Sequence, residues 1–420
     1  MKKTLLFAFT LLISLGLLAQ EQKEVVTGAG YADDVYYSLE NGTVATVQRD
    51  NWDIGFVVNY YSAGLSANTG SGVELYTWPD GDINDWADVD TVDMDWPPMY
   101  NSIVSFEEGA FNRNALDHPD YGWGIFSQSG SYPIIGDSLF VIKTISGAWK
   151  KLAIIEKIAS TNIWEFKYAN LDGTGEQTVT LEAGDYDDKY FVHYSIDSMK
   201  IQDREPAMVD WDLLFTRYYD YTIPYYVTGV LINDDHIMAQ EVRESGMDQA
   251  TQEGYVDTAF TDTISLIGSD WKYFDMDAME YAFIDTVVYY LKKDGGDSND
   301  SYYKIYFTGF SGGSFGGLGV YNFMQERLTF VSAEEHEFDT EKLLEVYPNP
   351  ASEKLHVVFD LVGQSEIEII DMTGRHVNKT YYDAAGFTNY SLDISSLNKG
   401  VYFVRVSAEG QSNILRFIKQ

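Results

Sequence analysis

The sequence predicts an all-β protein, and three observations carry that prediction. Aromatic residues make up 15% of the 420 residues, with 32 tyrosines, 23 phenylalanines and 9 tryptophans, a composition typical of β-rich proteins. Short alternating apolar segments recur about every 8–15 residues and are separated by Gly, Asp and Asn, which is the pattern of strands and turns. No stretch keeps a long period of 3.6 residues, so long helices are not expected.

The N-terminus has the composition of a secretory signal peptide. Lys2 and Lys3 precede an uncharged apolar run over 4–18, and the small residue Ala19 stands before a polar stretch. The alternative is a membrane anchor, but the run is shorter than the ~20 residues that a spanning helix needs. We therefore predict a signal peptide over 1–20 that is removed on export, and no transmembrane segment in the mature chain.

The charge and the missing cysteines exclude whole classes of partner. The chain holds 65 acidic and 28 basic residues, for a net charge of −37. Nucleic-acid binding requires clustered Lys and Arg, and an anionic membrane surface repels such a chain, so neither partner is expected. Because there are no cysteines, disulfides, thiolate metal sites, cysteine nucleophiles and a lipid on an N-terminal cysteine are excluded.

The body of the chain has the pattern of two copies of one unit. Trp52-Asp53 and Trp211-Asp212 each follow a strand and a polar turn, and the two pairs lie 159 residues apart. That spacing is far from the ~40–45 residues of a propeller blade, so the pairs are not a WD40 signature. Trp123 and Trp271 each stand 14 residues before an Asp that begins a new apolar strand. The predicted β lobes span 24–192 and 193–335.

The C-terminal segment differs in charge from the body. Residues 341–420 hold 10 acids and 8 bases, whereas residues 21–340 hold 55 acids and 18 bases. A shift of this size marks a domain boundary. Short strands separated by turn residues follow, so we predict a small immunoglobulin-like β-sandwich over 343–420.

Several motifs occur in order along this segment: Tyr347-Pro348-Asn349-Pro350, a turn at Gly374, Gly400-Val401-Tyr402, and a closing strand that ends at Lys419. In this order they resemble the type A C-terminal sorting domain of the type IX secretion system. The resemblance implies contact with the type IX machinery and export across the outer membrane. It also implies that the domain is removed and that the protein is released or fixed to the cell surface. The alternative is an ordinary adhesive sandwich.

The segments around the two Trp-Asp pairs carry a second resemblance. Residues 39–56, which end in Trp-Asp-Ile-Gly-Phe, residues 210–218 and residues 226–231 resemble the core of the HmuY-like family. Members of that family known to act are secreted or surface haem-binding proteins with an all-β fold. The resemblance therefore implies a haem or porphyrin ligand and an HmuY-like fold for both lobes.

A haem iron needs an imidazole or thioether ligand in an apolar pocket. His118 lies in a turn-rich loop over 114–123 beside aromatic residues and is the first candidate, with Met99 as a thioether partner. The alternative is a loop histidine that is hydrogen-bonded to Asp117 or Asp120.

A local excess of lysine suggests where the haem propionates would bind. Lys143, Lys150 and Lys151, followed by Lys157 and Lys167, stand among only two acidic residues in a strongly acidic body. The alternative is a solvated strand face whose charges keep a sheet edge from pairing.

Acidic loops suggest calcium, because hard oxygen ligands on loops suit this ion. Asp80, Asp82, Asn84 and Asp85 form the first cluster, and residues 294–300 form a second one. Neither has the spacing of an EF-hand. The alternative is a pair of solvated loops.

No serine-hydrolase elbow, zinc-protease helix or phosphate-binding loop occurs in the sequence, so no catalytic residue is assigned and no enzyme is expected. We expect a secreted or surface-attached binding protein whose ligand is haem or a related porphyrin. The alternative is a calcium-stabilised adhesion module that binds polysaccharide or protein. A secreted hydrolase with acidic catalytic residues is the third hypothesis.

Overall fold

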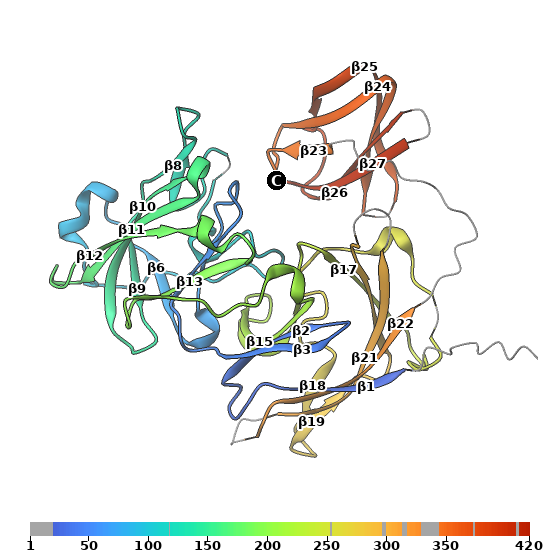
Figure 1. Ribbon diagram of the computed structural model, residues 1–420, viewed down its shortest axis with the longest axis horizontal. Helices are drawn as coiled ribbons and strands as arrows, with labels where there is room; N and C mark the ends of the chain where they lie inside the picture. The colour runs from blue at the N-terminus through green and yellow to red at the C-terminus, as the bar shows by residue number, and fades with distance from the viewer. Residues whose placement is uncertain are drawn as a thin grey trace, which may run out of the picture.

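The computed structural model describes residues 20–116, 118–252, 254–295, 300–312, 317–328, 344–372, 374–408 and 411–420 (Figure 1). The predicted signal peptide, apart from Gln20, lies outside these residues. The described part contains strands and short 3-10 turns and no α-helix, so the all-β prediction is confirmed. Within the same residues, no helix is long and apolar enough to cross a membrane.

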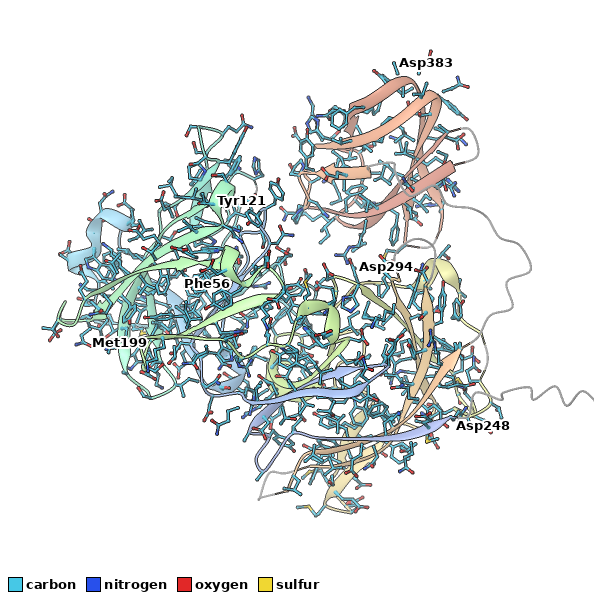
Figure 2. The ribbon with its side chains drawn as sticks, viewed as in Figure 1. Phe56, Tyr121, Met199, Asp248, Asp294 and Asp383 are labelled. Atoms are coloured by element: carbon cyan, nitrogen blue, oxygen red, sulfur yellow. The ribbon has the colours of Figure 1, made fainter. Side chains whose placement is uncertain are left out.

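The first lobe is a sandwich of two sheets. The larger sheet contains β12 (Gln177–Glu182), β11 (Ile163–Asn170), β10 (Trp149–Ile158), β8 (Pro133–Gly136), β7 (Gly124–Phe126), β9 (Phe140–Lys143) and β6 (Glu74–Thr77). The smaller sheet contains β14 (Lys200–Gln202), β13 (Phe191–Ser195), β4 (Ile54–Val57) and β5 (Leu65–Ala67). Fully buried Phe56 in the smaller sheet lies 5.2 Å, between ring centroids, from both Trp164 and Phe166 in the larger one (Figure 2). These rings join the two sheets through one apolar core.

The second lobe is built in the same way. Its larger sheet contains β1 (Glu21–Val26), β22 (Val320–Leu328), β21 (Ser301–Ser311), β20 (Val287–Lys293) and β17 (Ile237–Arg243). Its smaller sheet contains β16 (Tyr225–Ile232), β15 (Leu213–Asp220), β2 (Asp33–Ser38) and β3 (Gly42–Gln48), and a hairpin of β18 (Lys272–Asp275) and β19 (Glu280–Phe283) stands beside them. Trp271 stacks on Phe307 at 3.7 Å inside a core that draws on both sheets.

We call β1–β11 the first repeat and β12–β22 the second repeat. The first three strands of each repeat belong to sheets that are built mainly from the other repeat. The β2–β3 hairpin joins β15, where Tyr37 lies opposite Leu213, and β1 pairs along its length with β22. The β13–β14 hairpin joins β4 in the reciprocal way, with Tyr194 opposite Ile54, and β12 pairs with β11. The first lobe therefore consists of β4–β14, and the second lobe consists of β1–β3 and β15–β22.

This division differs from the expected lobes at 24–192 and 193–335. Residue 193 lies inside β13, which is a paired strand of the first lobe, and the N-terminal strands β1–β3 belong to the second lobe. The larger sheets share an order of five strands, since β1-β22-β21-β20-β17 corresponds to β12-β11-β10-β9-β6, and the first lobe adds β7 and β8 beside β10. The two halves of the body thus share one topology, with their first three strands exchanged.

The aspartates of the two Trp-Asp pairs hold the exchanged hairpins. The Asp53 carboxylate accepts a hydrogen bond from the backbone N–H of Ile196 at 2.7 Å, just after β13. The Asp212 carboxylate accepts one from the N–H of Leu39 at 2.7 Å, just after β2. Leu39 and Ile196 occupy equivalent positions, so each aspartate binds the hairpin that comes from the other repeat.

The tryptophans follow the same symmetry. The Trp52 ring meets the His193 ring edge-on at 4.5 Å, and the Trp211 ring meets the Tyr36 ring edge-on at 5.2 Å. Tyr36 and His193 are equivalent residues of the exchanged strands β2 and β13. Each Trp-Asp pair therefore holds a strand of the other repeat in place. This structural role explains why the pair occurs twice, and it does not require a bound ligand.

The C-terminal domain has its own core. Its strands are β23 (Leu344–Tyr347), β24 (Lys354–Asp371), β25 (His376–Asp393), β26 (Gly400–Ala408) and β27 (Gln411–Lys419). The first half of β24 pairs with β23 and its second half pairs with β26, so one long strand serves both layers of a sandwich. A parallel bridge between Ala351 and Lys419 brings the two ends of the domain together.

Candidate functional site

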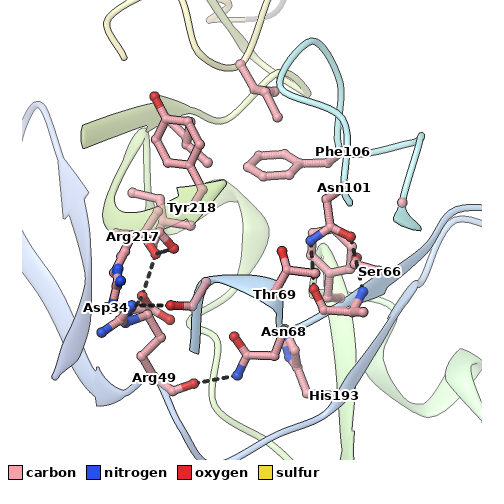
Figure 3. Close-up of a pocket in the computed structure, with 18 of the residues that line it drawn as sticks. Asp34, Arg49, Ser66, Asn68, Thr69, Asn101, Phe106, His193, Arg217 and Tyr218 are labelled. Carbon is pink, nitrogen blue, oxygen red and sulfur yellow. Dashed lines mark hydrogen bonds and ion pairs between the residues drawn. The ribbon is translucent and has the colours of Figure 1, made fainter. Parts of the chain in front are cut away.

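A cavity of about 110 Å³ lies at the junction of the two lobes (Figure 3). Its walls come from β2 and β15 of the second lobe and from β5 and β13 of the first. Figure 3 shows Phe106 and Tyr218 on one side of the space and Arg49 and Asn68 on the other. Its aromatic lining consists of Tyr36, Trp52, Phe106, Phe191, Trp211, Tyr218 and Tyr219. The strand exchange thus creates this cavity, because both exchanged hairpins meet there.

A buried ion-pair network forms one wall of the cavity. The Arg204 guanidinium binds the Asp34 carboxylate at 2.8 Å, and the Thr216 hydroxyl donates to the same carboxylate at 2.6 Å. The Arg49 Nε lies 3.9 Å from Asp34. Buried charges are tolerated only when they are paired and hydrogen-bonded, so this network fixes the geometry of the wall.

Glu205 is a second buried acid on the cavity. Its carboxyl group accepts hydrogen bonds from the Phe191 N–H at 2.8 Å and from the Tyr36 hydroxyl at 3.3 Å. Burial raises the pKa of Glu205 to about 7 against the opposing effect of these hydrogen bonds. The side chain therefore changes charge close to neutral pH.

His193 also lines the cavity and stays neutral. Burial, together with the positive charge of Arg204, holds the pKa of His193 well below its usual value. Its Nδ1 atom is buried and has no hydrogen-bond partner among the described residues. The packing against Trp52 explains why this strand position is occupied by a ring.

This arrangement is suited to binding. The cavity brings together aromatic rings and a few buried polar groups. Its volume is smaller than the roughly 300–1,000 Å³ of sites for drug-sized ligands. Aromatic walls with a few fixed polar groups favour a compact polar ligand.

The two predicted iron ligands do not line one cavity. His118 is exposed and lies 5.4 Å from the Phe126 ring, between ring centroids. Met99 is buried, and its sulfur accepts a hydrogen bond from the Thr77 hydroxyl at 3.2 Å. Met99 lines a separate surface groove whose lining does not include His118. Of the alternative partners of His118, Asp117 lies outside the described residues, and the Asp120 carboxylate binds the backbone instead.

The predicted propionate-binding lysines have partners within the protein. Lys143 forms an ion pair with Glu74 at 2.8 Å. Lys150 donates to an asparagine side chain, and the buried Lys151 donates to the Trp86 carbonyl at 2.8 Å. Each of the three ammonium groups therefore already has a partner within the protein. The alternative of a solvated face at a sheet edge does not describe these lysines either, because β10 is paired on both sides and Lys151 is buried.

The first acidic cluster caps a short 3-10 helix, η2 (Ile83–Asp88). Asp82 accepts a hydrogen bond from the Asn84 N–H at 2.8 Å, and Asp85 accepts one from the Asp82 N–H at 2.9 Å. Asp80 is exposed. Among the described residues, no group of three or more acidic or histidine side chains is arranged to hold a metal ion. Residues 296–299 of the second cluster lie outside the described part.

Asp34, Arg204 and Glu205 were not among the residues predicted from the sequence. The available signal was a charge inside an aromatic strand, since Asp34 directly precedes Val-Tyr-Tyr, and an adjacent Arg-Glu pair before a proline. A charge at such a position requires a buried partner.

The predicted sorting residues converge on the C-terminal strand. The Asn349 side chain accepts a hydrogen bond from the Ile418 N–H at 2.8 Å and donates to the Arg416 carbonyl at 3.3 Å. The Tyr402 ring stacks on Phe417 with centroids 5.8 Å apart. These contacts join the first and last motifs of the segment.

The remaining sorting residues shape the same domain. Gly374 has a φ of 78° and closes a turn through its N–H and the Asp371 carbonyl at 2.9 Å. The Tyr347 ring stacks on His356 at 5.0 Å, and Lys419 is buried at the parallel bridge. Pro348 and Pro350 lie in the connection after β23, and Gly400 begins β26 opposite Lys419.

Residues 345–420 match the family described as the secretion system C-terminal sorting domain. This segment is a type IX sorting domain. The sorting domain directs the chain to the type IX machinery and to export, either to the cell surface or into the medium. The prediction made from its motifs is confirmed, with the match beginning two residues after the predicted boundary.

Comparisons of the whole chain with curated proteins and with solved structures identify no family for the body. No curated protein matches the chain. Among solved structures, the chain is similar to the dimeric latent PorU from Porphyromonas gingivalis, with 10% identity and a TM-score of 0.18. That alignment covers 95% of this chain and 34% of PorU, so this chain spans about a third of that protein.

Proposed function

We propose that the mature protein is an exported, non-enzymatic binding protein that holds a compact polar ligand in the cavity between its lobes. The observation that carries the proposal is a cavity lined by strands of both lobes, in which aromatic rings of one shared cluster lie beside buried, hydrogen-bonded charged groups. Ligand sites commonly lie between such units and use a few fixed polar groups within an apolar lining.

Arg217 gives the proposal its test. This residue lines the cavity, and its guanidinium lies 5.0 Å from the Tyr226 ring centroid, with no ion-pair partner among the described residues. Arg217→Gln therefore removes a donor for the ligand and leaves the buried network intact. Arg327→Gln is the control, since Arg327 is exposed on β22 and does not line the cavity.

The experiment is a thermal-melting screen of the mature protein with free amino acids, hexoses and small carboxylic acids. We expect at least one compound to raise Tm in a saturable way in the wild type and in Arg327→Gln, and to lose at least tenfold in affinity in Arg217→Gln. Equal binding by all three proteins, or no binding by any of them, would contradict the proposal.

Haem is the second candidate ligand, and it is supported by the HmuY-like resemblance of the Trp-Asp segments. The two candidate ligands His118 and Met99 do not line a common cavity, so geometry adds no support. A haem titration followed by visible absorbance decides the matter. A saturable Soret shift that weakens in His118→Ala would favour haem, and no shift at micromolar haem would leave the resemblance as one of fold.

Calcium-stabilised adhesion remains the alternative function. It predicts that calcium raises the melting temperature of the body. The capping role of Asp82 and Asp85 predicts no such rise from the first acidic cluster.

A further inference from the structure

A second concave site lies on the surface between the lobes, next to the cavity. It is a groove of about 280 Å³. Residues around β6 and the loop after it form most of it, and Tyr221, at the turn that follows β15, comes from the second lobe. Its lining includes Pro97, Met99, Tyr100, Arg113, Asn114 and Tyr221.

The apolar walls of the groove are held in place from both lobes. Tyr100 stacks on Tyr219 of β15 with ring centroids 3.6 Å apart and an interplanar angle of 11°. The Met99 N–H donates to the Leu75 carbonyl of β6 at 2.8 Å. A preformed aromatic and proline surface of this kind offers flat apolar faces to a ligand ring at little entropic cost.

Arg113 stands out in this setting. The chain carries a net charge of −37, yet Arg113 has no ion-pair partner among the described residues. Its guanidinium instead lies 4.9 Å from the centroid of the Tyr221 ring, and its side chain is exposed. Such a cation retains all of its fork-shaped donor capacity for a planar anion.

Asn114 supplies a neutral polar group next to this cation. Its Nδ2 donates to the Thr77 hydroxyl at 2.9 Å, which fixes the side chain and leaves its carbonyl oxygen as an acceptor. A cation, an amide and tyrosine rings are therefore arranged around one groove.

We propose that this groove binds a carboxylate-bearing sugar ring, such as a hexuronate unit of an acidic polysaccharide. The sugar carboxylate pairs with Arg113, a hydroxyl group donates to Asn114, and the C–H face of the ring lies on the tyrosine and proline surface. The volume accommodates one or two rings and excludes a macrocycle. The proposal does not depend on the ligand of the neighbouring cavity.

The test is isothermal titration of the mature full-length protein with trigalacturonate and with its fully methyl-esterified form. We expect saturable binding of the acid, and at least tenfold weaker binding of the ester. We expect the same loss for the acid in Arg113→Gln. Tyr221→Leu, which removes the ring beneath Arg113, is expected to weaken binding at least fivefold. Unchanged melting curves show that both variants fold.

Two variants serve as controls. Arg327→Gln, on the exposed face of β22, and Arg217→Gln, in the cavity between the lobes, should bind trigalacturonate like the wild type. The proposal is overturned if the ester binds as well as the acid, if Arg113→Gln binds normally, or if neither sugar binds at about 10 mM. Loss of binding in Arg217→Gln alone would move the sugar to the cavity and overturn the groove as its site.

Discussion

At the residue scale, single buried acids determine how the lobes hold together. Asp212 is fully buried, and its carboxylate binds the Leu39 N–H, His236 Nε2 at 3.0 Å and Lys293 Nζ at 2.9 Å. The hydrogen bonds and the charge of Lys293 lower the pKa of Asp212 despite its burial. One side chain thus ties the exchanged hairpin to two elements of the second lobe.

We expect Asp212→Asn to destabilise the protein by about 2–4 kcal/mol, because it leaves Lys293 without its buried anionic partner and weakens the hydrogen bonds to His236 and Leu39. Urea unfolding at pH 7 measures the loss. Asp210→Asn is the matched control, since Asp210 is exposed two residues earlier, and it should change the free energy of unfolding by less than about 0.5 kcal/mol. Equal effects of the two substitutions would contradict the anchoring role of Asp212.

Glu205 makes stability depend on pH. Its pKa rises from 4.5 to about 7 on folding, so the folded state binds more protons between these values. The contribution of Glu205 to the free energy of unfolding is therefore fully present below about pH 4.5. It is lost as the pH rises through 7, and the total loss is roughly 3 kcal/mol. Glu205→Gln should flatten this part of the stability profile.

The measurement for Glu205 is chemical denaturation at a series of pH values from 4.5 to 8.5. The exposed Glu182 on β12 provides the control, because Glu182→Gln should keep the wild-type slope. A Glu205→Gln profile parallel to that of the wild type would show that the carboxyl group does not titrate in this window.

At the element scale, the exchanged strands make the two lobes unequal. The first lobe takes all of its strands from one continuous stretch, β4–β14. The second lobe needs β1–β3, which bring Val25, Val35, Tyr37 and Leu39 into its core. Its integrity therefore depends on the first strands of the chain.

A chain that begins at residue 49 should keep a folded first lobe and lose the second. Hydrogen exchange checks this, with protection expected to persist in β4–β14 and to disappear from β15–β22. Protection retained in both lobes would mean that β1–β3 add little to the second core, and protection lost in both would mean that the lobes fold as a single unit.

The sequence indicated the repeat and could not indicate the exchange. Trp52-Asp53 and Trp211-Asp212 revealed two similar units through local patterns of residues. Yet β2 and β13 share the same local pattern, Val-Tyr-Tyr-Ser in β2 and Val-His-Tyr-Ser in β13, so either hairpin suits either host sheet. The cavity was hidden for the same reason, since Asp34 and Arg204 meet only when the exchanged strand is in place.

At the scale of the whole molecule, export is assigned to the sorting domain and binding is proposed for the body. The sorting motifs could be recognised from sequence because Asn349, Gly374 and Tyr402 act within one short segment. The predicted ligand residues do not converge, because His118 is exposed on its loop whereas Met99 is buried beneath a groove that His118 does not line.

A chain that ends at residue 343 should remain in the periplasm of a host that has the type IX system. The physical reason is that all of the strands joined by Asn349, Tyr402 and Lys419 are then missing. Immunoblots of periplasm, cell surface and medium measure the distribution, with the full-length chain as the control. Efficient export of the shortened chain would place the sorting information in the body.

The pairing of β1 with β22 has a consequence for maturation. These are the first and last strands of the body, and their ladder pairs Glu21 with Gln325. In the described part of the chain, the sorting domain contributes no strand to the sheets of either lobe. A protease that cuts the chain after β22 therefore leaves the β1–β22 ladder intact, and the released body keeps its first and last strands paired with each other.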